Sequence, residues 1–211
     1  GAITLDTEDG DEGAAGNIYI DGIVNGNTGI GDRLTANAEG TPRGTVELNA
    51  AYGTTATGAL EVIGSTVELN SCTPSAGNLS VNGGSGITLN GTSYSSGGGV
   101  SFTGAVSLNN GVTVTGGGAL GDNITFDGSG VNTNGTVYAL TVDAGLGNVS
   151  LGGPIGTTNP LGVTTVVGAE ITLSSNIQTE GGNIDITGAL FLDGAITLDT
   201  EDGDEGAAGN I

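Results

Sequence analysis

The 211-residue sequence lacks methionine, tryptophan, histidine and lysine, and its only basic residues are Arg33 and Arg43. Twenty-three acidic residues stand against them, which gives a net charge of −21. Nucleic acids and anionic membrane surfaces are bound through Lys and Arg, so we expect neither as a partner. No apolar run approaches the ~20 residues that span a bilayer, so we also expect no membrane insertion.

The missing residue types also argue against catalysis. Without His or Lys, no base stands ready to activate the many Ser and Thr hydroxyls, and no nucleophile elbow is present. Asp122, Asp127 and Asp143 resemble ordinary turn and outward-facing residues, so we expect no catalytic residue, no enzyme and no organic cofactor.

Cys72 is the only cysteine and is expected to be a small packing residue. Scarce cysteine favours an exported, extracellular or cell-surface protein.

Glycine is abundant, with 44 residues, and it separates short alternating segments. In nearly every segment two aliphatic residues flank a Thr, Ser, Glu or Asp, as in Val46-Glu47-Leu48, Val106-Ser107-Leu108 and Val149-Ser150-Leu151. A period of two predicts strands with one buried and one wet face. High acidity with few aromatics can indicate disorder, but this patterning favours a folded chain. No window carries a helical period, so we predict essentially no helix.

Turn residues such as Asn25-Gly26, Asn90-Gly91 and Asp193-Gly194 lie between these segments. Hairpins with Asn-Gly turns are one interpretation. Strands of three to five residues suit a parallel β-helix better, because each strand pairs with the coil below and the inward side chains stack into one core. We therefore predict an all-β, right-handed parallel β-helix (solenoid). Coils of roughly 20 residues would give nine or ten coils and a rise of roughly 45 Å per 193 residues.

One stretch, GAITLDTEDGDEGAAGNI, occurs twice without a difference, at residues 1–18 and 194–211. The simplest interpretation is a tandem array, with residues 1–193 forming one repeat unit and residues 194–211 beginning the next. A self-contained protein with duplicated ends is the alternative. In the array, the partner of each unit is the chain itself, and rods could also bundle laterally.

Asparagine stands directly before several predicted strands. At the corner of a solenoid, stacked Asn side chains can bond to each other and to backbone groups along the axis. The alternative is that Gly-Asn is simply a common turn pair. The candidate structural turn residues are Asn17, Asn78, Asn123, Asn148, Asn183 and Asn210.

Residues 148–200 resemble the β-strand repeats of filamentous-haemagglutinin-like giant bacterial surface proteins. The resemblance is carried by Gly147-Asn148-Val149-Ser150-Leu151, Pro160-Leu161-Gly162, Val166-Val167-Gly168-Ala169 and the stretch from Gly182 to Gly188, and residues 98–130 share the cadence. It implies a right-handed parallel β-helix, export to the cell surface and a structural or adhesive rod. It transfers no functional residues, and residues 1–60 fit it least.

The duplicated stretch concentrates five carboxylates within seven residues around a glycine. Their repulsion would be relieved by a hard cation with oxygen ligands, above all Ca²⁺, although the spacing matches no EF-hand or RTX loop. A solvated acidic loop is the alternative. The candidate ligands are Asp6, Glu8, Asp9, Asp11, Glu12, Asp199, Glu201, Asp202, Asp204 and Glu205.

These observations favour a structural repeat module of a giant extracellular fibre-forming surface protein, a rod, sheath or stalk. An adhesin of the same architecture, which binds host or neighbouring cells, is the first alternative. A β-helical carbohydrate-active enzyme or a phage fibre is the more remote one.

Overall fold

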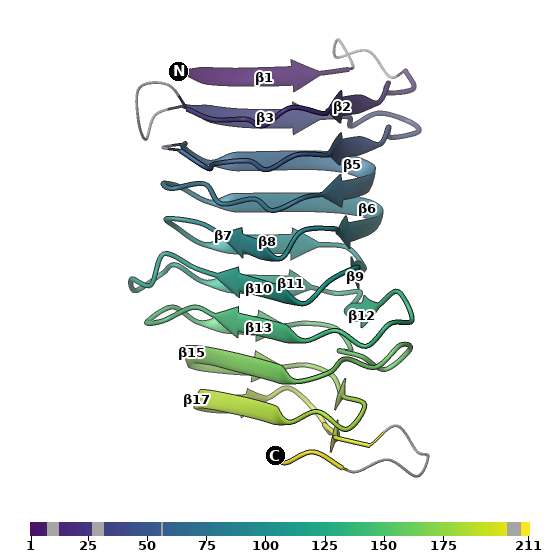
Figure 1. The fold of residues 1–211 in the computed structure, drawn as a ribbon, viewed down its shortest axis with the longest axis vertical. Coiled ribbons are helices and arrows are strands. Elements are labelled where there is room, and N and C mark those ends of the chain that lie inside the picture. The colour runs from purple at the N-terminus through teal and green to yellow at the C-terminus, as the bar shows by residue number, and fades with distance from the viewer. Residues whose placement is uncertain (8–12, 27–31, 56, 202–207) are drawn as a thin grey trace.

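A computed structural model describes residues 1–7, 13–26, 32–55, 57–201 and 208–211, and these are all-β with no helix. The chain winds as a parallel β-solenoid of about eight turns, from the N-terminal strand at one end to the C-terminus at the other (Figure 1). The predicted fold class is confirmed. The strands are β1 (Ala2–Asp6), β2 (Ile18–Ile20), β3 (Arg33–Asn37), β4 (Val46–Leu48), β5 (Leu60–Leu69), β6 (Leu79–Leu89), β7 (Ser93–Ser95), β8 (Val100–Thr103), β9 (Val106–Leu108), β10 (Val112–Thr115), β11 (Ile124–Asp127), β12 (Val131–Thr133), β13 (Leu140–Asp143), β14 (Val149–Leu151), β15 (Thr164–Leu173), β16 (Ile177–Gln178), β17 (Ile184–Leu192) and β18 (Leu198–Asp199).

The parallel pairings define three faces around the axis. Face A carries β1, β3, the first halves of β5 and β6, β8, β11, β14 and the second halves of β15 and β17. Face B carries β2, β4, the second halves of β5 and β6, β9, β12, Ile155, β16 and β18. Face C carries Val24, Tyr52, Cys72, β7, β10, β13 and the first halves of β15 and β17.

Several predicted pairs of short strands are single strands that turn a corner. The segments at 60–62 and 67–69 form one strand, β5, whose register shifts between Gly64 and Thr66. The Asn82-Gly83 pair, whose residue types are typical of turns, lies inside β6 in the same way. Glycine permits the bend without a side chain at the corner, so the strand passes from face A to face B without a loop.

The coils are on average longer than the expected 20 residues, so there are about eight of them rather than nine or ten. Residues stacked on adjacent coils are 19 apart at Asn90 and Asn109 but 31 apart at Asp6 and Asn37. The variation lies in the connections, because surface loops lengthen without disturbing the strand stack.

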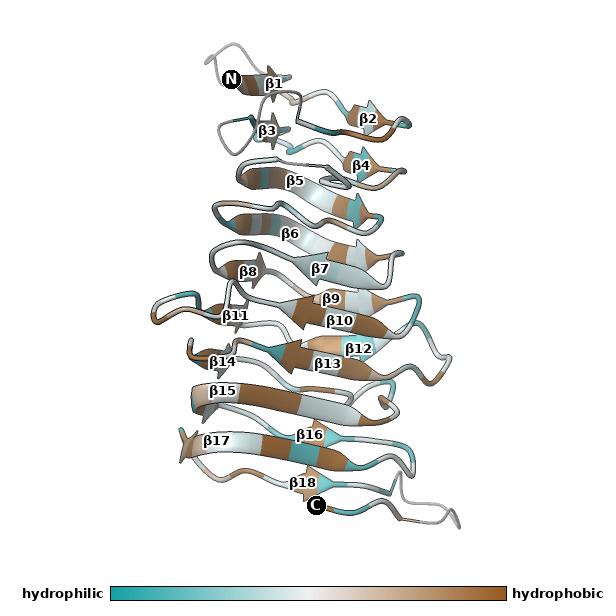
Figure 2. Cartoon of the chain, turned by 60° about the vertical axis from the view of Figure 1, so that its left-hand side comes forward, coloured by the Kyte–Doolittle hydropathy of each residue, from teal (hydrophilic) through white to brown (hydrophobic). Residues whose placement is uncertain are grey.

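The core is a set of axial columns of aliphatic side chains, and hydropathy alternates along the strands as Figure 2 shows. Leu60, Val62, Val67 and Leu69 of β5 are all fully buried, while Glu61 and Glu68 between them are exposed and half-buried, respectively. Near the middle, the rings of Phe102 and Phe126 stack with centroids 5.1 Å apart. Each inward residue therefore loses its contact with water only because the coils above and below cover it.

One glycine shows how closely adjacent coils approach. Gly104 has a φ of +127°, and a Cβ atom there would collide with the carbonyl oxygen of Gly83 on the coil above. We expect Gly104→Ala to lower the free energy of unfolding by about 1–3 kcal/mol, since both the backbone angle and the contact oppose a side chain. Gly111→Ala is the matched control, because only the Ala139 carbonyl oxygen lies near, at 3.9 Å. Urea unfolding of both variants measures the difference, and equal effects would contradict the packing argument.

Candidate functional site

Only part of the predicted calcium site lies in the described residues. Asp6 accepts a hydrogen bond from the side chain of Asn37 at 3.4 Å, and Asp199 accepts one from the backbone N–H of Glu201 at 3.0 Å. Within the described ranges, no three acidic, His or Cys side chains gather as a metal-binding group. Calcium binding stays a prediction, because seven candidate ligands fall outside the described residues: Glu8, Asp9, Asp11, Glu12, Asp202, Asp204 and Glu205.

The base of the acidic stretch is closed identically in its two copies. The Thr7 hydroxyl donates to the Gly16 carbonyl oxygen at 3.0 Å, and the Thr200 hydroxyl donates to the Gly209 carbonyl oxygen at 3.1 Å. Both bonds span nine residues. The same sequence therefore forms the same local closure at opposite ends of the solenoid.

Four of the six turn asparagines make one kind of contact, which joins adjacent coils. In each, the side-chain oxygen accepts a backbone N–H from the next coil; the pairs are Asn17 with Thr45 (2.8 Å), Asn78 with Gly99 (3.1 Å), Asn123 with Asn148 (2.8 Å) and Asn183 with Asn210 (2.9 Å). The side chain of Asn148 instead donates to Glu170 at 3.3 Å. These residues thus bind the backbone of the next coil rather than one another.

A second column of amides follows the strands of face B instead of preceding them. The side chain of Asn109 donates to that of Asn90 at 2.7 Å, and that of Asn70 donates to the carbonyl oxygen of Asn49 at 3.0 Å. Asn49 in turn donates to Asp21 at 2.9 Å. The sequence analysis missed this column, although its signal is simple: each Asn directly follows a Val-x-Leu or Ile-x-Leu segment.

The turn contact can be tested at the well-packed middle of the solenoid. We expect Asn123→Ala to lower the free energy of unfolding by about 0.5–1.5 kcal/mol, because the N–H of Asn148 loses its acceptor. Asn123→Asp keeps an acceptor oxygen in place and should lose less. Denaturant midpoints of the two variants decide the matter, and an Asp variant as weak as the Ala variant would count against the contact.

Two of the three aspartates considered for catalysis, Asp122 and Asp143, take part in turns, and Asp127 ends β11. Asp122 accepts from the N–H of Ala119 at 2.9 Å, and Asp143 accepts from the N–H of Gly145 at 2.9 Å. Both bonds close loops of a few residues, which is the usual role of Asp at turns.

Face C holds a buried column of titratable side chains, Tyr52, Cys72 and Tyr94, paired on successive coils. Each is at most 1% exposed. The Tyr94 hydroxyl donates to the Leu69 carbonyl oxygen at 2.8 Å, and the Cys72 thiol faces the carbonyl oxygen of Asn70 at 3.3 Å. Burial raises the pKa of the Cys72 thiol to about 12 and also raises the pKa values of Tyr52 and Tyr94. A thiol with this pKa stays protonated and unreactive near neutral pH.

This column makes the fold sensitive to alkali. In the unfolded chain the thiol ionises near its ordinary pKa of 9.0, but in the folded chain only near 12. Between these values the unfolded state binds fewer protons, so stability falls as pH rises, by up to about 1.4 kcal/mol per pH unit. We expect Cys72→Ala to flatten the fall in urea midpoint above pH 9, because the two tyrosines remain in both proteins. Equal slopes, or reaction of the folded wild-type thiol with a thiol reagent at pH 8, would contradict this.

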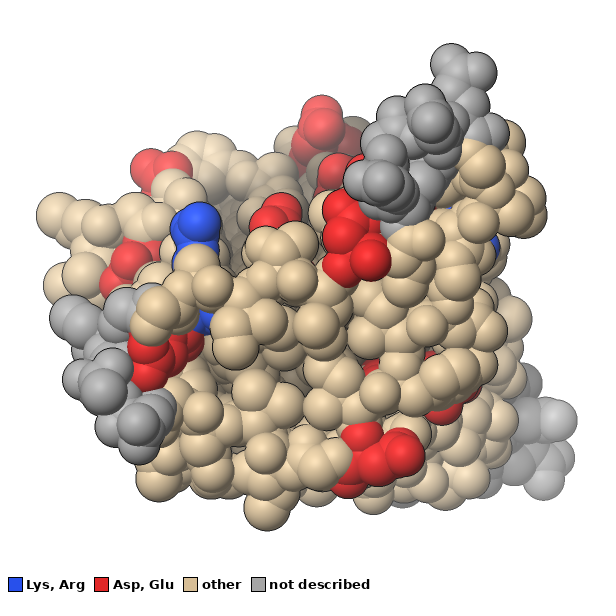
Figure 3. All heavy atoms as spheres, turned by 90° about the horizontal axis from the view of Figure 1, so that it is seen from above, with Lys and Arg blue, Asp and Glu red and all other residues tan. Residues whose placement is uncertain are grey.

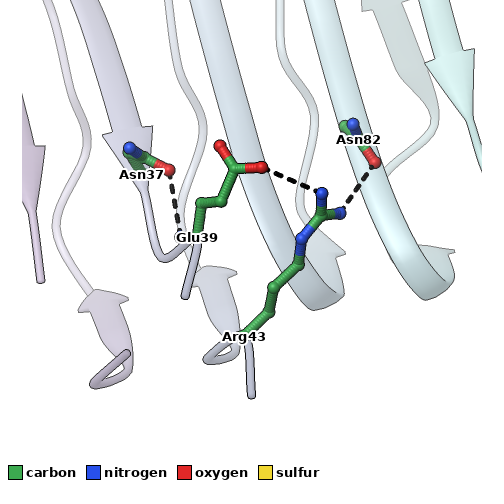
Figure 4. Close-up of polar contacts among 4 residues, drawn as sticks. All are labelled: Asn37, Glu39, Arg43 and Asn82. Atoms are coloured by element: carbon green, nitrogen blue, oxygen red, sulfur yellow. Dashed lines mark hydrogen bonds and ion pairs between the residues drawn. The ribbon is translucent and has the colours of Figure 1, made fainter. Parts of the chain in front are cut away.

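Arg43 joins two coils on the surface, across the coil of β5 that lies between them. Its guanidinium donates to Glu39 at 3.0 Å and to the side-chain oxygen of Asn82 at 3.4 Å, while Asn37 accepts from the N–H of Glu39 (Figure 4). The ion pair is partly exposed, so its contribution to stability is modest. Its effect is to hold the connection between β3 and β4 against β6.

The hollows along the described residues include a groove on face A and an opening at the N-terminal end. A polar groove of about 250 Å³ on face A is lined by Asn78, Ser80, Gly99, Val100, Ser101, Gly121, Asn123 and Thr125. The second, of about 290 Å³, opens at the N-terminal end, where Figure 3 looks down on it, and Ile3, Val24, Leu34 and Tyr52 line its apolar wall. The latter is the upper end of the core itself.

Comparisons with protein-family models, with curated proteins and with solved structures find no match to this chain. The described residues also include no helix long and apolar enough to cross a membrane. The filamentous-haemagglutinin-like resemblance therefore rests on the strand motifs alone.

Proposed function

We propose that the chain is a structural repeat module of a giant extracellular fibre-forming surface protein, with no catalysis. The observation that carries the proposal is the combination of a core that runs through about eight stacked turns with the perfect recurrence of residues 1–18 at 194–211. Stacked repeats stabilise one another through nearest-neighbour contacts, so such a rod lengthens without a new fold. In this proposal residues 1–193 are the unit and 194–211 begin the next.

The surface chemistry suits a rod that is exposed to proteases. Only two basic residues occur in 211, so trypsin has few sites, and the Arg43 side chain is held by Glu39 and Asn82. The strongly negative surface also opposes aggregation of neighbouring rods, because like-charged surfaces repel.

An adhesin is the second candidate, and one observation favours it. Leu120, in the loop between β10 and β11, is 83% exposed, and Leu146, 61% exposed, lies on the adjoining loop. The two loops touch, since the N–H of Leu146 donates to the Gly118 carbonyl oxygen at 3.4 Å. Neighbouring exposed leucines on one corner form a small apolar surface of the kind that contacts partners.

Antibodies raised against the folded chain test the location and the fibre together. We expect them to label filaments or the outer surface of intact, unpermeabilised cells of the source organism in immunogold electron microscopy. Brief protease treatment of the cells should leave the labelled material largely intact, because stacked strands hide the backbone. Labelling that appears only after permeabilisation would overturn the extracellular assignment, and labelled material without elongated shape would overturn the fibre.

A further inference from the structure

The duplicated stretch is seen with two different sets of neighbours. In the N-terminal copy, β1 has a coil only below it, and Ile3 and Leu5 are 61% and 38% exposed. In the C-terminal copy, β18 has a coil only above it, and the equivalent Ile196 and Leu198 pack half-buried against the core. The N-terminal copy therefore shows how the stretch contacts a coil below it, and the C-terminal copy shows how it contacts a coil above it.

The contacts on the two sides use different atoms. In the C-terminal copy, the carbonyl oxygen of Asp199 accepts the N–H of Thr179 from the coil above, at 2.9 Å. In the N-terminal copy, Asp6 is the equivalent of Asp199, and Thr7 follows it. The N–H of Thr7 donates to the carbonyl oxygen of Asn37 on the coil below, at 3.2 Å. A single copy can thus make both bonds at once.

The second strand of the stretch repeats this arrangement. The carbonyl oxygen of Asn210 accepts the N–H of Ile184 from above, and the N–H of Ile18, equivalent to Ile211, donates to Thr45 below, both at 2.9 Å. The asparagine contact continues as well: the Asn183 side chain accepts from Asn210, and the side chain of the equivalent Asn17 accepts from Thr45. The upper and lower registers are therefore compatible at both described strands of the stretch.

The two copies lie on different faces. Leu198 pairs with Ile177 in face B, whereas the equivalent Leu5 pairs with Ala36 in face A. Asn210 bonds to Ile184 in face C, whereas Asn17 precedes β2 in face B. From the start of one unit to the start of the next, the chain therefore winds around the solenoid axis by a whole number of turns plus one further face.

We propose that successive copies of the 193-residue unit stack end to end, so that residues 1–18 of one copy occupy the position of residues 194–211 of the copy before it. Each copy is rotated about the solenoid axis by one face, which is a third of a turn. The partner at each end is a second copy of this unit. The inference rests on the proposed function only in requiring that the unit is repeated.

The apolar surfaces at the two ends fit this stacking. At the C-terminal end of face A, Leu190, Phe191 and Leu192 are 41%, 52% and 56% exposed. Because the next copy is rotated by one face, its Val24 lies directly below these three residues. At the N-terminal end of the unit, Val24 lines the hollow of about 290 Å³ beside Ile3 and Leu34. Stacking covers apolar side chains at both ends and closes the open strand edges.

A two-unit chain, residues 1–193 followed directly by the full 1–211, tests the junction. We expect one cooperative unfolding transition, with a higher urea midpoint and a slope close to twice that of the 211-residue chain, because more surface is exposed in a single step. Two units that unfold with the midpoint and slope of the 211-residue chain would overturn the junction.

The identical sequences supply a matched pair of variants. In the two-unit chain, Leu198→Asp places a carboxylate in the junction, whereas Leu5→Asp makes the same change in the same local sequence at the free N-terminal end. Leu198→Asp should return the midpoint and slope to those of the 211-residue chain, and Leu5→Asp should leave both nearly unchanged. Equal effects of the two variants would overturn the proposed register.

The rotation is measured separately by electron cryo-microscopy of a chain of several units. At ~4.8 Å per coil, we expect a rise of about 40 Å and a turn of about 120° per unit. A straight stack without rotation, or separate beads, would overturn the inference. If the several-unit chain forms a coupled, rotated rod but the natural protein is never found outside cells, the proposed junction stands and only the extracellular function is overturned.

Discussion

Parallel pairing between successive coils is the interaction on which the structure depends. Many strands are only three residues long and bury only two side chains of their own, as β4, β9 and β14 do. Such a strand forms no stable sheet alone, but between two others its backbone groups are paired and its inward side chains lie under cover. Stability therefore belongs to the stack, and each coil contributes mainly through its neighbours.

The same dependence explains the distribution of charge. The buried positions hold apolar side chains and a few Thr and Ser, whereas the carboxylates of the described residues stand at outward positions of the strands or in connections. Register even places Glu47 directly beside Glu68 on face B, where like charges repel. Both side chains are only partly buried, and salt in the solvent screens the repulsion. The net charge of −21 is tolerated because, among the residues that the structure describes, no carboxylate is buried in the core.

Alternation of apolar and polar residues was sufficient to predict the strands, the absence of helix and the parallel stack. It could not predict that 60–62 and 67–69 form one strand, because a glycine between two apolar segments is equally compatible with a turn and with a bend. Nor could it predict the column of Tyr52, Cys72 and Tyr94, since Tyr52 and Cys72 enter face C as single paired residues with no alternation around them. Asn123 was found from its place before a strand, but its acceptor role depends on which backbone N–H the next coil presents.

The turn by one face places a demand on the sequence of the duplicated stretch. Residues 1–18 and 194–211 lie on different faces and against different neighbours, yet both close through a Thr hydroxyl and a Gly carbonyl nine residues apart. The local structure is therefore set within the stretch itself, by the strand, the threonine and the Gly-Asn that follows. The neighbouring coil has to supply only what any face supplies, which is an inward aliphatic residue and a paired backbone, as Ile177 does above Leu198 and Ala36 does below Leu5. The same segment therefore fits face A in one copy and face B in the other, so the number of turns per unit need not be whole.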